Sequence, residues 1–307
     1  MPLGIEELTV LGFIAMAFTL LILERFSSMS RSLAPVQDRW LTNIGLMFLG
    51  GFFIALLFPA SLGAVAGDMP GGLIRDLQWP LWLETAVVFL LLDCWRYWEH
   101  RAFHEIPLLW RLHLVHHSDT AVDVTTAERH HPFERILGTL LAFMLVFALG
   151  FSLQAVGLYL FLATLAALYS HGNITLPEVI DQRLRRLLVT PSVHHIHHSS
   201  YQPETDSNYG SVLTVWDRLF GTYTEPSSTR VTRVGLESFR LPRDRTLASA
   251  LVQPFLAWRD GGAPEPTGQP ARATGGAVYS RAWLQALSLE VSGWCWHWRP
   301  CGQRCWT

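Results

Sequence analysis

Charged residues are scarce in this chain. Of its 307 residues, 16% are charged and 50% are hydrophobic, whereas soluble domains carry roughly 25% charged residues. Basic and acidic residues nearly cancel, leaving a formal net charge of −2, so a nucleic-acid partner is not expected. A mean hydropathy of +0.24 and thirteen tryptophans indicate a membrane protein. Five tryptophans fit an interfacial belt: Trp79, Trp82, Trp95, Trp98 and Trp110.

Cysteines and cofactor motifs are also few. One of the four cysteines is Cys94 and the other three lie near the C-terminus, which is no disulfide framework and fits a reducing compartment. No P-loop occurs, and no GxGxxG motif follows a predicted strand. Any electrons would therefore come from another protein. The N-terminal apolar run lacks the basic segment of a secretory signal.

Histidine is abundant and crowded. His100 and His104 are four residues apart, and two further motifs have the spacing i, i+3, i+4: His113, His116 and His117, and then His194, His197 and His198. Such residues share one face of a helix, so we expect each motif to project its imidazoles from one patch. Neutral imidazole is a ligand for Zn, Cu, Fe or Ni. Eight imidazoles are too many for one ion, so two ions are predicted; surface histidines or a pH-sensing cluster are the alternative.

Five apolar runs could enter a membrane, at 8–23, 41–62, 79–93, 136–151 and 154–169. The last two could be tilted spans, a hairpin that leaves the membrane on the face it entered, or a buried soluble helix pair. The first loop, with Arg25, Arg31 and Arg39, is more basic than the loop around Asp68, which predicts that the first loop is cytoplasmic. Every histidine motif then falls on that same face.

Composition also divides the chain. Residues 1–260 are predicted to form one membrane domain, with the histidine motifs in a core at about 93–224. Residues 261–307 read as a Gly/Pro-rich linker and a tail. The tail holds Cys295, His297, Cys301 and Cys305, whose spacing matches no structural zinc motif.

The histidine motifs carry a family resemblance. HRAFH at 100–104, HLVHH at 113–117 and HHIHH at 194–198 occur with TAERHHPFE, SHGN, NYG and WDRLFGTY. In this the chain resembles the fatty acid hydroxylase/sterol desaturase superfamily over roughly 39–255. The resemblance implies an all-α integral membrane bundle of about four transmembrane or re-entrant helices. It also implies a cytosolic helical cap that holds a histidine-rich dimetal site.

The same resemblance implies an activity and its cofactors. Two iron ions would use O2, and electrons from a ferredoxin- or cytochrome b5-like donor, to hydroxylate or desaturate a lipid. Zinc could replace iron in a purified preparation, by the affinity order of divalent metals. The implied metal ligands are His100, His104, His113, His116, His117, His131, His171, His194, His197 and His198. Fatty acyl chain, sterol, carotenoid and ether lipid all stay open as substrates, because the pocket residues are generically apolar.

Residues around the ligands have expected roles as well. Ligating imidazoles usually donate their second N–H to a carboxylate or carbonyl, and we expect Asp93 and Glu134 to accept such bonds. His130 and His195 are expected beside the ligands or on the surface, and Asn208 in the layer around the ligands.

Two other functions compete with a lipid oxygenase. A metal transporter or storage protein would need polar or ionisable residues inside the membrane spans. The predicted spans contain almost no such residues. A zinc-dependent membrane hydrolase would need an open metal position and a general base. Ten candidate ligands look too many for that site.

Overall fold

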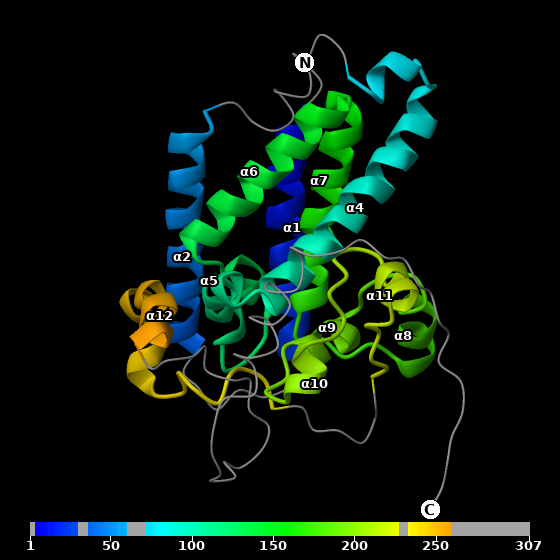
Figure 1. Ribbon diagram of the computed structural model, residues 1–307. Coiled ribbons are helices and arrows are strands. Elements are labelled where there is room, and N and C mark those ends of the chain that lie inside the picture. The colour runs from blue at the N-terminus through cyan, green and yellow to red at the C-terminus, as the bar shows by residue number, and fades with distance from the viewer. Residues whose placement is uncertain (1–3, 30–35, 60–71, 227–232, 260–307) are drawn as a thin grey trace, which may run out of the picture. The chain divides into compact units, whose positions relative to one another are not determined.

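The computed structural model describes residues 4–29, 36–59, 72–226 and 233–259 (Figure 1). Within these ranges the chain is helical, and the β-structure consists of two isolated bridges, Leu188 with Leu213 and Ser199 with Val234. The predicted all-α class is confirmed. The predictions for 261–307, including Cys295, His297, Cys301 and Cys305, lie outside the described residues.

Four helices are long and apolar enough to cross a membrane: α1 (Ile5–Phe26), α2 (Val36–Leu57), α6 (Pro132–Leu149) and α7 (Leu153–His171). Helix α1 packs against α7, and α2 packs against α6 (Figure 1). Large apolar side chains such as Phe18, Phe48 and Phe147 are exposed on them. That exposure is favourable when the surrounding solvent is lipid, and it accords with an integral membrane protein.

The predicted third span, 79–93, has a different outcome. It is the first half of α4 (Leu81–Glu105), which is not among the four helices apolar enough to span a membrane. Val88 and Leu92 of α4 are buried in a core with Val156 and Tyr159 of α7. Because α4 continues without a break, the same helix that packs on the apolar bundle also carries His100 and His104.

The predicted hairpin is a pair of helices. Between α6 and α7 the chain turns at Gly150, whose φ of 66° lies in the left-handed region that favours glycine. As α6 leaves the end that carries the histidines and α7 returns to it, His171 comes back toward α9 (Pro191–His197), against which α7 packs.

Short helices gather where α4 and α7 end (Figure 1). This end holds α5 (Pro107–His117), η2 (Val124–Glu128), α8 (Glu178–Leu184), α9, α10 (Gln202–Thr205), α11 (Val215–Phe220), η3 (Pro242–Arg245) and α12 (Leu247–Arg259). One further turn, η1 (Arg75–Leu77), precedes α4. The short helix α5 packs between α4 and α12.

A buried ionic network fixes α5 to α2. Arg39 was predicted to be a loop charge, but it lies in α2 with 2% exposure and donates hydrogen bonds to Asp119 and Asp123. Asn43 bridges the two sides of the network, donating to Asp119 and accepting from Arg129. Burial would raise the pKa of Asp119, but Arg39 and Arg129 outweigh it and hold that pKa well below its usual range. The network therefore stabilises the chain next to the histidines of α5.

Candidate metal centre

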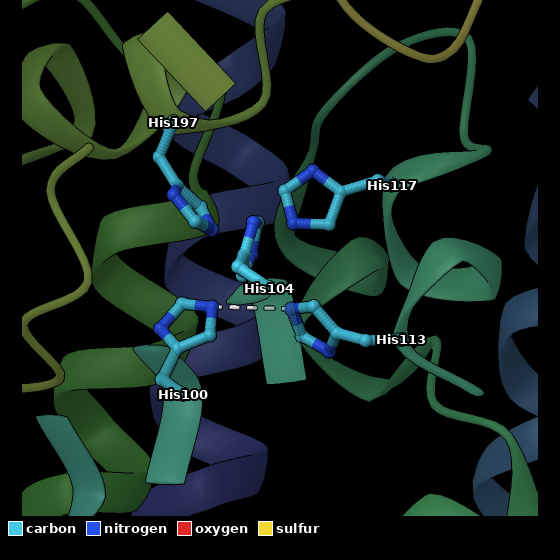
Figure 2. Close-up of side chains that lie close together, drawn as sticks. All are labelled: His100, His104, His113, His117 and His197. Carbon is cyan, nitrogen blue, oxygen red and sulfur yellow. Dashed lines mark hydrogen bonds between the residues drawn. The ribbon is translucent and has the colours of Figure 1, made fainter. Parts of the chain in front are cut away.

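Nine histidines form two clusters, and in each cluster one ring nitrogen per residue lies within 4.8 Å of all the others. Cluster A, drawn in Figure 2 with its rings turned toward one another, consists of His100, His104, His113, His117 and His197. Cluster B consists of His116, His171, His194 and His198. The two clusters adjoin, because the ring centroids of His117 and His198 are 4.6 Å apart.

Each HxxHH motif is divided between the clusters. On α5, His113 and His117 enter cluster A and His116 enters cluster B. The motif beginning on α9 has the reverse assignment, with His197 in cluster A and its two other histidines in cluster B. The ring centroids within each motif lie no more than 5.5 Å apart, so each motif projects its imidazoles from one patch as expected, but that patch serves two sites. Adjacent helical residues point about 100° apart, so the last two histidines of a motif are directed to different sites.

Facing nitrogens show what these rings can hold. The Nε2 atoms of His100 and His113 are 3.1 Å apart, and those of His116 and His171 are 3.2 Å apart. The outer nitrogen, Nδ1, of each of these four rings lies 2.7–3.2 Å from an accepting oxygen, which is the carboxylate of Glu134 for His113 and a backbone carbonyl for the other three. Because these oxygens only accept, each Nδ1 carries the hydrogen and each Nε2 a lone pair. Facing lone pairs repel one another unless a cation lies between them, so the residues present fit metal ions.

Burial keeps the rings in the form that binds metal. In cluster A, Nε2 of His104, Nε2 of His197 and both nitrogens of His117 are buried without a hydrogen-bond partner, a rare condition for polar atoms. Desolvation lowers the pKa of His197 to about 3 and places the pKa of His117 and His198 well below 6.5. At neutral pH these imidazoles are therefore uncharged.

His131 is the one predicted ligand that the structure places in neither cluster. It is the N-cap of α6, where its Nδ1 accepts a hydrogen bond of 3.2 Å from the backbone N–H of Phe133. Its Nε2 lies 3.4 Å from the carbonyl oxygen of Leu251. Both nitrogens therefore face backbone groups, and His131 caps the start of α6.

Glu134 and His130 lie directly behind the rings. Oε1 of Glu134 accepts hydrogen bonds from Nδ1 of His113 at 2.7 Å and from Nδ1 of His130 at 2.8 Å. The ring of His130 stacks on that of His116, with centroids 4.5 Å apart and planes inclined by 9°. One carboxylate thus contacts a cluster A ring and, through His130, a ring of cluster B.

Asp93 has a different role from the one predicted. Its carboxylate accepts hydrogen bonds from the backbone N–H groups of Val212 and Leu213 and from the indole of Trp216. These bonds fasten the loop before α11 to α4. None of the hydrogen bonds that the structure shows for Asp93 joins it to an imidazole.

His195 and Asn208 support α9 without entering a cluster. His195 is buried, and its ring meets the backbone of His171 and Gly172. The Asn208 amide donates to the carbonyl oxygens of Val193, in α9, and Thr224. Asn208 has φ +56°, a left-handed conformation that asparagine tolerates better than most residues.

Sequence reasoning missed two aromatic rings of the site. Trp110, predicted to lie in an interfacial belt, is 5% exposed and covers cluster A, with ring centroids 5.0 Å from His104 and 5.4 Å from His117. Tyr209 lies 5.1 Å from His104 on the same measure. For Trp110 a signal was available, since it lies three residues before His113 and so shares a helix face with it.

Comparisons with known proteins agree with this geometry. The fatty acid hydroxylase family model matches residues 85–222. An ornithine lipid hydroxylase from Rhizobium tropici is 29% identical over 181 residues, covering 58% of this chain and 52% of that protein. An alkylglycerol monooxygenase from Xenopus tropicalis is 34% identical over 150 residues, 48% and 31% respectively. A lathosterol oxidase from Mus musculus is 29% identical over 166 residues, 53% and 50%. No solved structure matches.

Fold and site together define a helical membrane protein with two histidine clusters that can hold metal. The family match contains all nine clustered histidines. Residues 85–222 match the fatty acid hydroxylase family model, and this match, with the similarity to lipid hydroxylases and oxidases, confirms the predicted resemblance. The chain spans from about a third to about half of the length of these relatives.

Proposed function

We propose that this protein is a membrane-bound di-iron oxygenase that uses O2 and external electrons to hydroxylate a C–H bond of a lipid. The observation that carries this proposal is the pair of buried clusters in which Nε2 lone pairs face one another at one end of an apolar helical bundle. Relatives named hydroxylase and monooxygenase support hydroxylation over desaturation.

Iron is proposed because of the reaction. Amino-acid side chains do not break an unactivated C–H bond, so a cofactor has to supply that step. Two iron ions held by the clusters would supply the redox chemistry that activates O2. Imidazole suits iron as well as zinc, but zinc has no redox chemistry. Zinc found in a purified preparation would therefore be read as a substitute.

The chain's own residues would hold and shield this centre. Carbonyl oxygens of Tyr209, Ala167 and Ser207 accept from the Nδ1 atoms of three of the histidines and so fix the plane of each ring. Trp110 covers cluster A and excludes water from it. A lipid would approach from the apolar helices, because α4 and α7 lead from the bundle to the clusters.

The lipid and the electron donor are proposed by class. The relatives' names refer to an ornithine lipid, an alkylglycerol and a sterol, which share a large apolar part, so we propose a lipid of that kind. A ferredoxin- or cytochrome b5-like protein would deliver electrons. Arg25, at the last turn of α1, supports a cytoplasmic position for the active site.

The test compares lipid extracts from cells that express the protein or one of three variants. We expect one lipid to gain the mass of one oxygen, dependent on O2, with the wild-type chain. His104→Ala and His197→Ala should abolish that change and lower bound metal. The matched control is His131→Asn, because asparagine preserves a helix N-cap and residue 131 lies outside both clusters. Full turnover by either alanine variant would contradict the proposal.

A further inference from the structure

We infer that Glu134 is a shared positioning residue that joins the two metal positions, acting directly on cluster A and through the stacked ring of His130 on cluster B. This inference rests on the proposal that both clusters hold metal. It goes further by assigning two links to the Glu134 carboxylate. One is a direct hydrogen bond to a ring of cluster A, and the other is an indirect contact, through His130, with a ring of cluster B.

The direct link is a charged hydrogen bond. Oε1 of Glu134 lies 2.7 Å from Nδ1 of His113, whose Nε2 faces His100 inside cluster A. A carboxylate that accepts the outer N–H of an imidazole fixes the ring and raises its basicity as a ligand. The Glu134 side chain is 8% exposed, so this bond is little weakened by solvent.

The indirect link passes through a ring that is not itself a ligand in either cluster. His130 donates from Nδ1 to the same oxygen, Oε1 of Glu134, at 2.8 Å. Its imidazole then lies almost parallel to that of His116, at a centroid distance of 4.5 Å. Nδ1 of His116 faces the carbonyl oxygen of Arg129 at 3.2 Å. Glu134 therefore orients His130, and His130 limits the rotation of His116.

This arrangement makes the two links separable. Phenylalanine in place of His130 would keep an aromatic ring against His116 but would have no N–H to offer Glu134. Glutamine in place of Glu134 would keep an accepting oxygen but lose the charge. The effect of position 134 on cluster B should then depend on which residue occupies position 130.

The test uses the full chain in detergent, freed of metal and titrated with Co2+ alone, whose absorption bands report each position. His100→Ala and His194→Ala identify the bands of clusters A and B. Glu134→Gln should weaken Co2+ binding at both positions by about 10-fold, the lower end of the range for residues that support a metal ligand. His130→Ala should weaken cluster B by about as much and change cluster A by less than about 3-fold.

The double variant decides the question. In the His130→Phe background we expect cluster B to bind Co2+ within about 3-fold of wild type and no longer to respond to Glu134→Gln, a loss of coupling of the kind that double-mutant cycles detect. Glu128→Gln is the control, because Glu128 pairs with Arg135 at 2.7 Å and belongs to neither histidine cluster. If Glu134→Gln spares cluster B in the wild-type chain, or still weakens it in the His130→Phe background, the inference is overturned.

The outcomes also separate this inference from the proposed function. A chain that shows this Co2+ pattern but oxidises no lipid would retain the inference and lose the oxygenase. A chain that oxidises lipid but whose cluster B is unaffected by substitution at position 134 would retain the oxygenase and lose the inference. If Glu134→Gln is not obtained as a folded protein, the unequal response of the two clusters to His130→Ala decides the matter.

Discussion

Clusters A and B both draw on the histidine motifs of α5 and α9. Cluster A takes two rings from the first motif and one from the second, cluster B takes the reverse, and the surroundings of the two clusters differ. In cluster A, two rings face carboxylates: His113 faces Glu134 at 2.7 Å and His104 faces Asp206 at 3.4 Å. In cluster B, the outer nitrogens of His116 and His171 face backbone carbonyls. Cluster A also has five imidazoles and cluster B four.

This difference has a chemical meaning. Carboxylates make an imidazole a stronger donor to metal than neutral carbonyls do, so an ion in cluster A would experience more negative charge. An ion in cluster B, with fewer ligands, would keep more open positions, as catalytic metal sites do. The two positions should therefore differ in affinity and in reactivity although they share α5 and α9.

The largest losses of activity should come from histidines on the helices that serve a single cluster. Among the clustered histidines, α4 contributes only to cluster A and α7 only to cluster B. We expect His104→Ala and His171→Ala each to reduce lipid turnover by at least about 100-fold, since even residues that only support a ligand are worth 10–100-fold. Metal analysis should show one ion lost and one kept in each variant. Loss of both ions in both variants would remove the distinction between the clusters.

A second substitution should affect both clusters together. Arg39→Ala leaves the buried carboxylate of Asp119 without its main partner, and breaking such a pair typically costs about 3–5 kcal/mol. Because Arg129 of the same network donates to the carbonyl oxygen of Val115 in α5, both metal positions should lose affinity. Thermal unfolding in detergent measures the first effect. Arg243→Ala, at an 82% exposed side chain, is the control and should change little.

Acid should destabilise the metal-free protein through the buried histidines of both clusters. Unfolded histidine binds a proton near pH 6.5, but His197 in the fold has a pKa of about 3 because burial disfavours its charged form. The unfolded chain therefore binds more protons below pH 6.5, and stability falls as the pH decreases. Each such residue contributes about 1.4 kcal/mol per pH unit there. Stability that is equal at pH 7.5 and 5.5 would contradict this.

The smallest expected effect concerns cluster A alone. Burial raises the pKa of Asp206 to about 6, so its carboxylate is charged at pH 7.5. Its contact with His104 is long, at 3.4 Å, and its side chain is 39% exposed. Asp206→Asn should weaken metal binding in cluster A by less than the roughly 10-fold expected for supporting residues, and leave cluster B unchanged. A larger loss than that of Glu134→Gln would reverse the ranking.

Much of this site could be predicted because it depends on local spacing. The motifs around His104, His116 and His197 predicted helices and two ions, since i, i+3 and i+4 relations hold on any helix. Which ring enters which cluster could not be predicted. That depends on how α5 and α9 are rotated relative to each other, and packing between distant segments decides it.

The errors had a common cause. Arg39 and Asp93 were interpreted from their neighbours in sequence, as a loop charge and as an imidazole partner. Their actual partners include Asp119 for Arg39 and Trp216 for Asp93, which are 80 and 123 residues away. His131 fits a family motif, yet its position at the start of α6 directs its ring to the backbone. For residues of this kind only tertiary contacts fix the role.

The division of each motif between two clusters has a consequence for variation in chain length. One added residue between His113 and His116 would turn the later rings by about 100° about the helix axis, so that His116 would point where His117 now points and His117 would point away from its cluster. Inserted residues in a surface loop would leave the rings where they are. The spacing of the two clusters therefore depends on helical geometry, and residues can be added to the chain only outside the histidine motifs.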